Sequence, residues 1–160
     1  MIKRTTAALA IGALVAGGAA AHGATAAARP ASAHPAMGTM SQTVMLGSEN
    51  MSGVTGVATL TYNPMTKSTT AKLVYKHLHA MTVHPAHFHL GSSCSANGPV
   101  AYAFAPLHAG NNGIATETKT FPAKLFGSGV KAHYYINLHQ GPGLAGKQFT
   151  VLSCGVVNNM

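Results

Sequence analysis

Short runs of β-branched and aromatic residues alternate with turn-forming residues along most of this chain, and no long segment of that part has a helical apolar period. Such runs favour strands, and the intervening Gly, Pro, Asn and Ser favour turns. We predict eight strands, at residues 42–46, 54–62, 68–77, 87–90, 100–104, 114–121, 131–139 and 148–156. Eight strands at this spacing are typical of an all-β fold, either an antiparallel sandwich or a Greek-key barrel.

The first residues are typical of an export signal, which we place at residues 1–28. Lys3 and Arg4 precede an apolar run of small residues, and further small residues offer cleavage positions. The run is too short to favour a membrane-spanning anchor. Residues 29–40, rich in Pro, Ala and Gly, are predicted to be a flexible lead-in, and residues 41–160 to be one β domain. We therefore expect a secreted, envelope or periplasmic protein without a transmembrane segment in its mature form.

The scarcity of acidic residues excludes several kinds of site. Glu49 and Glu117 are the only two, against ten Lys and Arg and ten His. A Ser-His-Asp triad and a carboxylate calcium cage lack their residues, and glycoside hydrolysis would need both glutamates together. The positive charges are scattered along an exported chain, so nucleic-acid binding is not expected. Histidine is therefore the main source of site chemistry.

Cys94 and Cys154 are the only cysteines. In an oxidising compartment a single pair is typical of one disulfide. Closing a loop of this length would stabilise the fold by about 4 kcal/mol in the chain-entropy model. Two thiolate ligands of a soft metal are the alternative.

Two predicted strands carry histidines opposite their apolar residues. In the sequence HFHL, Phe88 and Leu90 share one face while His87 and His89 share the other. In the sequence HYYINLHQ, Tyr134, Ile136 and Leu138 share one face of the strand. The opposite face carries His133, Tyr135, Asn137 and His139. Because the apolar residues face the core, we expect the histidines on the outward, polar face of the sheet.

The histidine spacing indicates a metal site. His87 and His89 would have Cα atoms about 6.6 Å apart on the same side of a strand. Both imidazoles can then bind one ion, and a third histidine from a neighbouring strand would complete a three-nitrogen site suited to copper or zinc. For an isolated H-x-H pair, a polar strand face without metal is the alternative. A fourth ligand could come from His84 or, as the second choice, from His108, although a solvated histidine is the favoured interpretation of each.

Two further groups have the chemistry to hold metal. His77 and His79 repeat the i, i+2 spacing, although a polar strand face is the favoured interpretation. Met37 and Met40, in the lead-in, offer thioether ligands for Cu(I).

These stretches also resemble known families. HFHLGSSCSANGPV resembles the region of copper/zinc superoxide dismutases in which two copper-binding histidines precede the disulfide cysteine and a Gly-Pro. YYINLHQ is similar to their strand that ends in a copper-binding histidine, and Cys154 begins a similar closing CGV. The same stretches resemble the CHRD module, named from chordin, through H-x-H, N-G-P-V and Y-x-N-x-H. Together the resemblance covers residues 54–157.

The dismutase resemblance implies an eight-stranded Greek-key barrel with its metal outside the barrel, under loops. It makes His87, His89 and His139 copper ligands. Tyr135 and Asn137, which share the outward face with His139 and belong to the Y-x-N-x-H pattern, are expected to support these ligands. The dismutase resemblance also implies that the disulfide joins the two cysteines of the chain.

The chain departs from the dismutase pattern at three points. The metal-bridging histidine corresponds to Val100, and the arginine that guides superoxide corresponds to Val151. The aspartate of the zinc site has no counterpart, because the chain contains no aspartate. Zinc is therefore not expected, whereas a copper-only site is, and the resemblance leaves superoxide turnover open.

Three functions are compatible with these residues. The first is a copper-only oxidoreductase that disproportionates superoxide, and the second is an envelope protein that stores or buffers copper. The third is a non-catalytic, CHRD-like extracellular module whose histidines are structural. The missing arginine and bridging histidine argue against the first function, and three histidines on one face argue against the third. We predict an exported copper-binding protein of dismutase-like fold.

Overall fold

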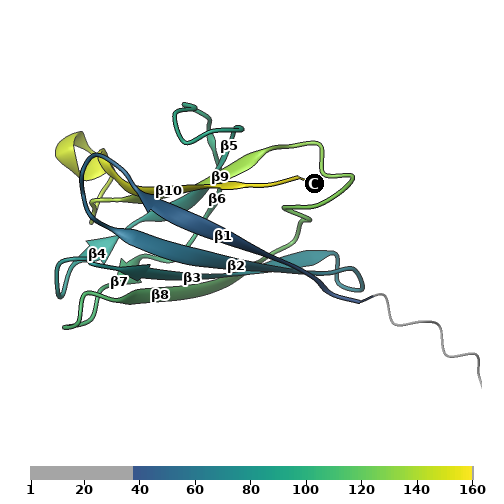
Figure 1. The fold of residues 1–160 in the computed structure, drawn as a ribbon, viewed down its shortest axis with the longest axis horizontal. Helices are drawn as coiled ribbons and strands as arrows, with labels where there is room; N and C mark the ends of the chain where they lie inside the picture. Colours follow the sequence, from purple (N-terminus) through teal and green to yellow (C-terminus); the bar gives the residue numbers. More distant parts are fainter. Residues whose placement is uncertain (1–37, 160) are drawn as a thin grey trace, which may run out of the picture. The chain divides into compact units, whose positions relative to one another are not determined.

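The computed structural model describes residues 38–159, so the predicted export signal and residues 29–37 of the predicted lead-in, Met37 included, lie outside the described residues (Figure 1). This part of the chain contains ten strands and one short 3-10 helix, and no helix in it is long and apolar enough to cross a membrane. The elements are β1 (Met40–Ser48), β2 (Thr55–Asn63), β3 (Ser68–Lys76), β4 (Val83–His84), β5 (Ala86–Leu90), β6 (Val100–Ala103), β7 (Leu107–His108), β8 (Ala115–Phe121), β9 (Tyr134–His139), η1 (Gly146–Phe149) and β10 (Val151–Val157).

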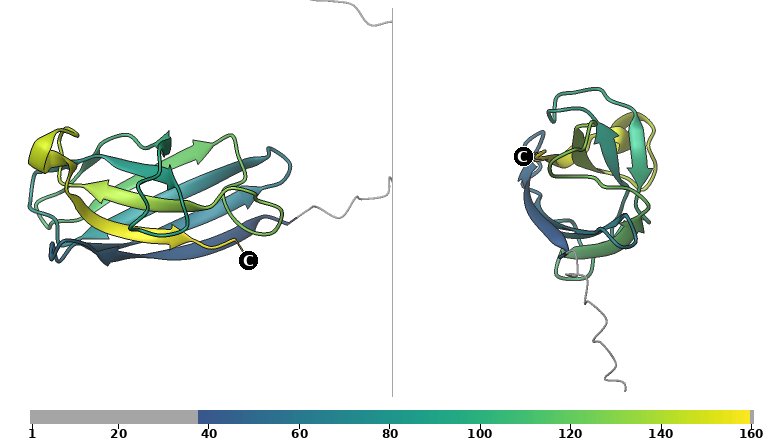
Figure 2. Two further views of the ribbon diagram at one scale, coloured as in Figure 1. Left: turned by 90° about the horizontal axis from the view of Figure 1, so that it is seen from above. Right: turned by 90° about the vertical axis from the view of Figure 1, so that its right-hand side faces the viewer.

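Eight strands form one antiparallel sheet in the order β6-β5-β9-β10-β1-β2-β3-β8. β9 follows β8 in the chain but pairs with β5, and β10 returns to pair with β1, as in Greek-key connections. The sheet curves into a nearly closed barrel, which the right-hand view of Figure 2 shows from one end. Lys119 Nζ on β8 donates to the Ala103 carbonyl of β6 at 2.8 Å, which links the two edge strands. The predicted all-β fold of eight antiparallel strands is confirmed.

Element boundaries differ from the prediction near the histidines. β9 begins at Tyr134 rather than at residue 131, and β10 begins at Val151 because the residues before it form η1. Met40, predicted as the end of the lead-in, begins β1 and pairs with Tyr62. The two-residue strands β4 and β7 were not predicted, because two residues are too few to show a period.

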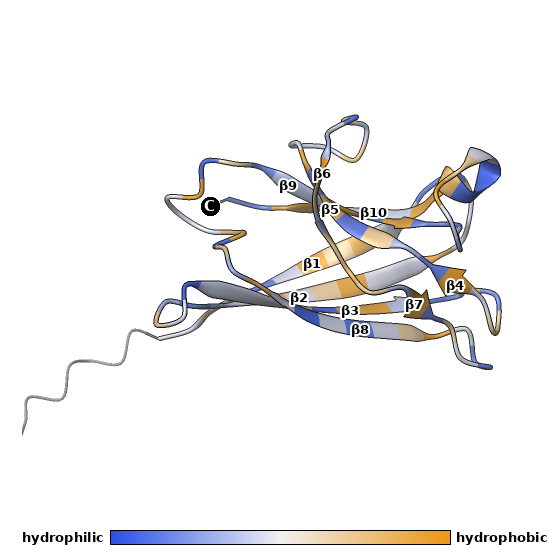
Figure 3. Cartoon of the chain, turned by 180° about the vertical axis from the view of Figure 1, so that it is seen from behind, coloured by the Kyte–Doolittle hydropathy of each residue, from blue (hydrophilic) through white to orange (hydrophobic). Residues whose placement is uncertain are grey.

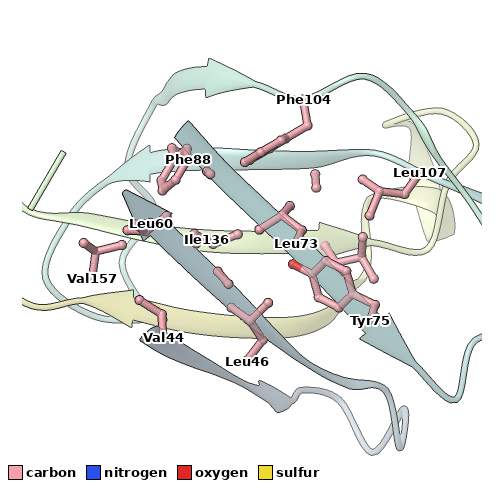
Figure 4. Packing of buried hydrophobic residues seen from close by; sticks show 14 of the residues in the cluster. Val44, Leu46, Leu60, Leu73, Tyr75, Phe88, Phe104, Leu107, Ile136 and Val157 are labelled. Carbon is pink, nitrogen blue, oxygen red and sulfur yellow. The ribbon is translucent and has the colours of Figure 1, made fainter. Parts of the chain in front are cut away.

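Alternating side chains fill the barrel interior. Hydropathy changes repeatedly along β1 and β5 (Figure 3), and the apolar members of each strand enter a common core. Figure 4 shows Phe88 and Ile136 in this core, and both are fully buried. The Phe88 ring lies 5.4 Å from the rings of Phe104 and Phe121. Leu90, predicted to share the inward face, is 38% exposed where β5 ends. Because Phe88 and Ile136 point into the core, the alternate side chains of β5 and β9 point to the outside of the barrel.

Candidate metal centre

Three histidines meet on the outer face of the barrel, where β5 and β9 are neighbours. His87 and His89 come from β5 and His139 is the last residue of β9. One ring nitrogen from each residue lies within 4.8 Å of the other two. The ring centroids are 5.5 Å apart for His87 and His139, 5.7 Å for His87 and His89, and 6.1 Å for His89 and His139. We call this group the histidine trio.

The trio is buried although it lies outside the barrel core. His87, His89 and His139 are 7%, 6% and 1% exposed. The strand pattern predicts the face on which each histidine lies, and the dismutase resemblance implies a site under loops; loops do fold over this face and bury the trio. The ring of Phe149, in η1, packs on the His139 ring at a centroid distance of 5.0 Å.

Backbone carbonyls set the orientation of two trio rings. His89 Nδ1 donates to the Gly98 carbonyl at 2.9 Å, and His139 Nδ1 donates to the Phe149 carbonyl at 2.8 Å. Because a carbonyl only accepts, these Nδ1 atoms carry the proton and each Nε2 keeps its lone pair.

One buried nitrogen of each trio ring has no hydrogen-bond partner among the described residues: His87 Nδ1, His89 Nε2 and His139 Nε2. Buried polar atoms without a partner are rare in folded proteins. A metal-binding histidine commonly donates its second ring N–H to a backbone carbonyl, as His89 and His139 do here. The donor set therefore fits a metal ion held by three imidazoles.

Burial also keeps two rings of the trio, those of His87 and His139, uncharged. The pKa of His87 is lowered from 6.5 to about 4, mainly by burial, with smaller contributions from the nearby His139 and His89. Burial lowers the pKa of His139 as well, against the raising effect of its bond to Phe149. Neutral imidazole is the form that binds metal, so these two rings are in the binding form at neutral pH.

Tyr135 supports His89 in two ways. Its ring stacks on the His89 ring, with centroids 5.1 Å apart and planes 17° apart. Its hydroxyl donates to the Ala96 carbonyl at 2.6 Å and accepts from the Gly98 N–H at 3.1 Å. Gly98 is required here because a Cβ would lie 1.5 Å from the Leu90 carbonyl oxygen. The tyrosine therefore holds Gly98, the residue whose carbonyl orients His89.

A disulfide holds the same loop against the sheet. Cys94 and Cys154 are bonded, with Cα atoms 5.9 Å apart, so the predicted disulfide is confirmed. Cys154 pairs with Asn137 in the register of β9 and β10. The β5–β6 loop is thus covalently attached to the strand beside the trio.

In a comparison with known protein families, residues 23–145 match the model of the CHRD domain family. The chain belongs to the CHRD domain family. The matched range includes the whole trio and the residues that orient His89, so the CHRD part of the predicted resemblance is confirmed. A comparison with curated proteins found no match.

His84 lies behind the trio of this CHRD domain and is not part of it. The residue is 4% exposed, and its Nδ1 donates to the backbone carbonyl of His139 at 3.0 Å. Its Nε2 lies 2.7 Å from the Thr82 hydroxyl. Both ring nitrogens therefore have partners, and the structure places His84 as a support for the end of β9. The sequence alone could not reveal this role, because the acceptor is a backbone atom.

The other candidate histidines lie elsewhere in the CHRD domain. His108 is exposed at the end of β7. His77 and His79 line a cleft of about 560 Å³, together with Met81 and one side of His84. No trio residue lines this cleft, so the structure does not bring the second i, i+2 pair to the trio.

Proposed function

We propose that this CHRD domain binds one copper ion through His87 Nδ1, His89 Nε2 and His139 Nε2. The observation that supports the proposal is the set of three buried ring nitrogens, one per residue, that lack hydrogen-bond partners. Imidazole suits copper, and Cu(II) binds such sites more tightly than other divalent first-row ions, zinc included. Bound copper would supply one-electron redox chemistry at this position.

We propose further that the protein works outside the cytoplasm, as a secreted or cell-envelope protein. The disulfide between Cys94 and Cys154 is of a kind that persists in oxidising compartments. Membership of the CHRD family agrees, since these domains occur in extracellular proteins. The basic and apolar character of the first residues is typical of an export signal.

Holding copper without turnover is the function we favour. The trio residues are no more than 7% exposed, which suits retention of an ion. The positions that correspond to the bridging histidine and guiding arginine of dismutases carry Val100 and Val151. The remaining interpretation is a CHRD module in which the trio has a purely structural role. This role does not explain why three buried ring nitrogens lack hydrogen-bond partners.

Superoxide disproportionation is the second candidate. The arrangement of the trio favours it: an H-x-H pair lies on β5, and a histidine ends β9, the neighbouring strand of the sheet. Both lie outside an eight-stranded Greek-key barrel, and this arrangement resembles that of copper/zinc dismutases. The reaction would convert two superoxide ions and two protons into dioxygen and hydrogen peroxide. A stopped-flow superoxide assay on copper-loaded protein separates this candidate from copper storage.

Two double variants test the copper site. His87→Ala with His89→Ala removes two trio rings, and His77→Ala with His79→Ala removes the equally spaced pair in the cleft. Equilibrium dialysis with Cu(II) should give one tightly bound ion per chain for the wild type and for the cleft variant, and none for the trio variant. Undiminished copper affinity in the trio variant would show that the assignment is wrong.

A further inference from the structure

Unpartnered polar atoms concentrate on one face of the domain. Seven buried side-chain nitrogen or oxygen atoms of residues 38–159 have no hydrogen-bond partner, and four of them belong to β5 and β9. Three are the trio nitrogens that the proposed function uses. The fourth is Oδ1 of Asn137.

The strand register places Asn137 on the same sheet face as the trio. It is the direct cross-strand partner of His87, so the two side chains project from the same side of the sheet. His139 lies two residues further along β9 and shares that face. Tyr135, two residues earlier, pairs with His89 and stacks on its ring. The Asn137 side chain therefore projects from the same face of the sheet as the three histidines, across from His87.

Asparagine is a costly choice at this position. It is depleted in strands, and Asn137 is 6% exposed in a strand whose residues are all buried. A buried acceptor without a donor destabilises the metal-free fold, whereas an apolar side chain of similar size would not. Neither Tyr135 nor His84, which support the trio, donates to this oxygen. The position therefore favours a ligand that needs the oxygen.

We infer that Asn137 Oδ1 is the fourth donor to the ion held by the trio. A carboxamide oxygen is neutral and serves as a weak copper ligand in proteins. Among the described residues, no carboxylate belongs to the trio group that it would join. The inference rests on the proposed copper site and specifies its donors as three nitrogens and one oxygen.

Asn137→Leu tests this inference, because leucine removes the oxygen and keeps the branched shape and the number of side-chain heavy atoms. Cu(II) affinity, measured by competition with a chelator, should fall by about tenfold or more, with a changed Cu(II) EPR spectrum. The melting temperature of the metal-free protein should stay the same or rise, since an unpartnered buried oxygen is lost. Asn159→Leu is the matched control: Oδ1 of Asn159 is also buried and unpartnered, but this residue is outside the trio group, so copper affinity should not change.

Asn137→Asp keeps an oxygen at the same place and should restore copper affinity to the wild-type value or above. Wild-type affinity and EPR spectrum in Asn137→Leu would overturn the inference while leaving the copper site intact. A lower melting temperature with unchanged affinity would overturn it too and assign Asn137 a structural role. Absence of copper from the wild type would instead defeat the proposed function itself, together with the inference.

Discussion

Removal of one oxygen atom, in Tyr135→Phe, should loosen the support of the metal centre without disturbing the barrel. The Tyr135 hydroxyl bonds the Ala96 carbonyl and the Gly98 N–H, and both bonds are partly buried. The phenyl ring of the variant can still stack on His89. The main chain of the β5–β6 loop also stays attached, because Cys94 and Cys154 remain bonded.

The magnitude follows from the two bonds that are lost. Each typical hydrogen bond contributes about 0.5–1.5 kcal/mol to stability, so the free energy of unfolding should fall by about 2 kcal/mol. Because the Gly98 carbonyl orients His89 through a 2.9 Å bond, copper affinity should fall as well, by about tenfold.

Urea unfolding of the oxidised, metal-free protein measures the first effect, as a lower midpoint at constant m value. Tyr102→Phe is a matched control, because the Tyr102 side chain is only partly buried and its hydroxyl makes no hydrogen bond with residues 38–159. The control should unfold like the wild type. A Tyr135→Phe variant with wild-type stability and wild-type copper affinity would refute the reasoning.

Three other perturbations have defined outcomes. Cys94→Ser should lower the free energy of unfolding by about 4 kcal/mol, as expected for a crosslink over 60 residues, yet leave copper binding in place; an unchanged melting temperature under oxidising conditions would contradict this. Gly98→Ala should cost about 3 kcal/mol and weaken copper binding, because its Cβ meets the Leu90 carbonyl; urea unfolding with chelator competition measures both. The free energy of unfolding of the metal-free protein should fall as the pH is lowered from 6.5 to 4, because His87 is protonated at a higher pH in the unfolded chain than in the folded protein. Urea unfolding at several pH values should show a total loss of about 3 kcal/mol, and a flat pH profile would contradict the prediction.

The strand pattern was sufficient to predict the fold because each strand buries one face. The alternation of Phe88 with His87 and His89 decides which side chains enter the barrel, because a one-residue shift in register would move the phenylalanine to the outer face. The same rule places His139 opposite Ile136 on β9. The face of each candidate ligand was therefore predictable before any contact was known.

The dismutase resemblance implies a cover of loops over the trio, but the contacts that form this cover were not predictable from the sequence. It depends on carbonyl oxygens of Gly98 and Phe149, which any residue type supplies, and on loops without a regular period. The support by His84 has the same origin, because its acceptor is the main chain of His139. The unpartnered oxygen of Asn137 becomes visible only when every neighbouring donor has been located.

Anomalous diffraction at the copper absorption edge, from crystals of the copper-loaded protein, tests the central claim most directly. The account predicts one strong peak about 2 Å from His87 Nδ1, His89 Nε2 and His139 Nε2. A protein that retains no copper at micromolar metal, or a peak beside His77 and His79 with none at the trio, would contradict it.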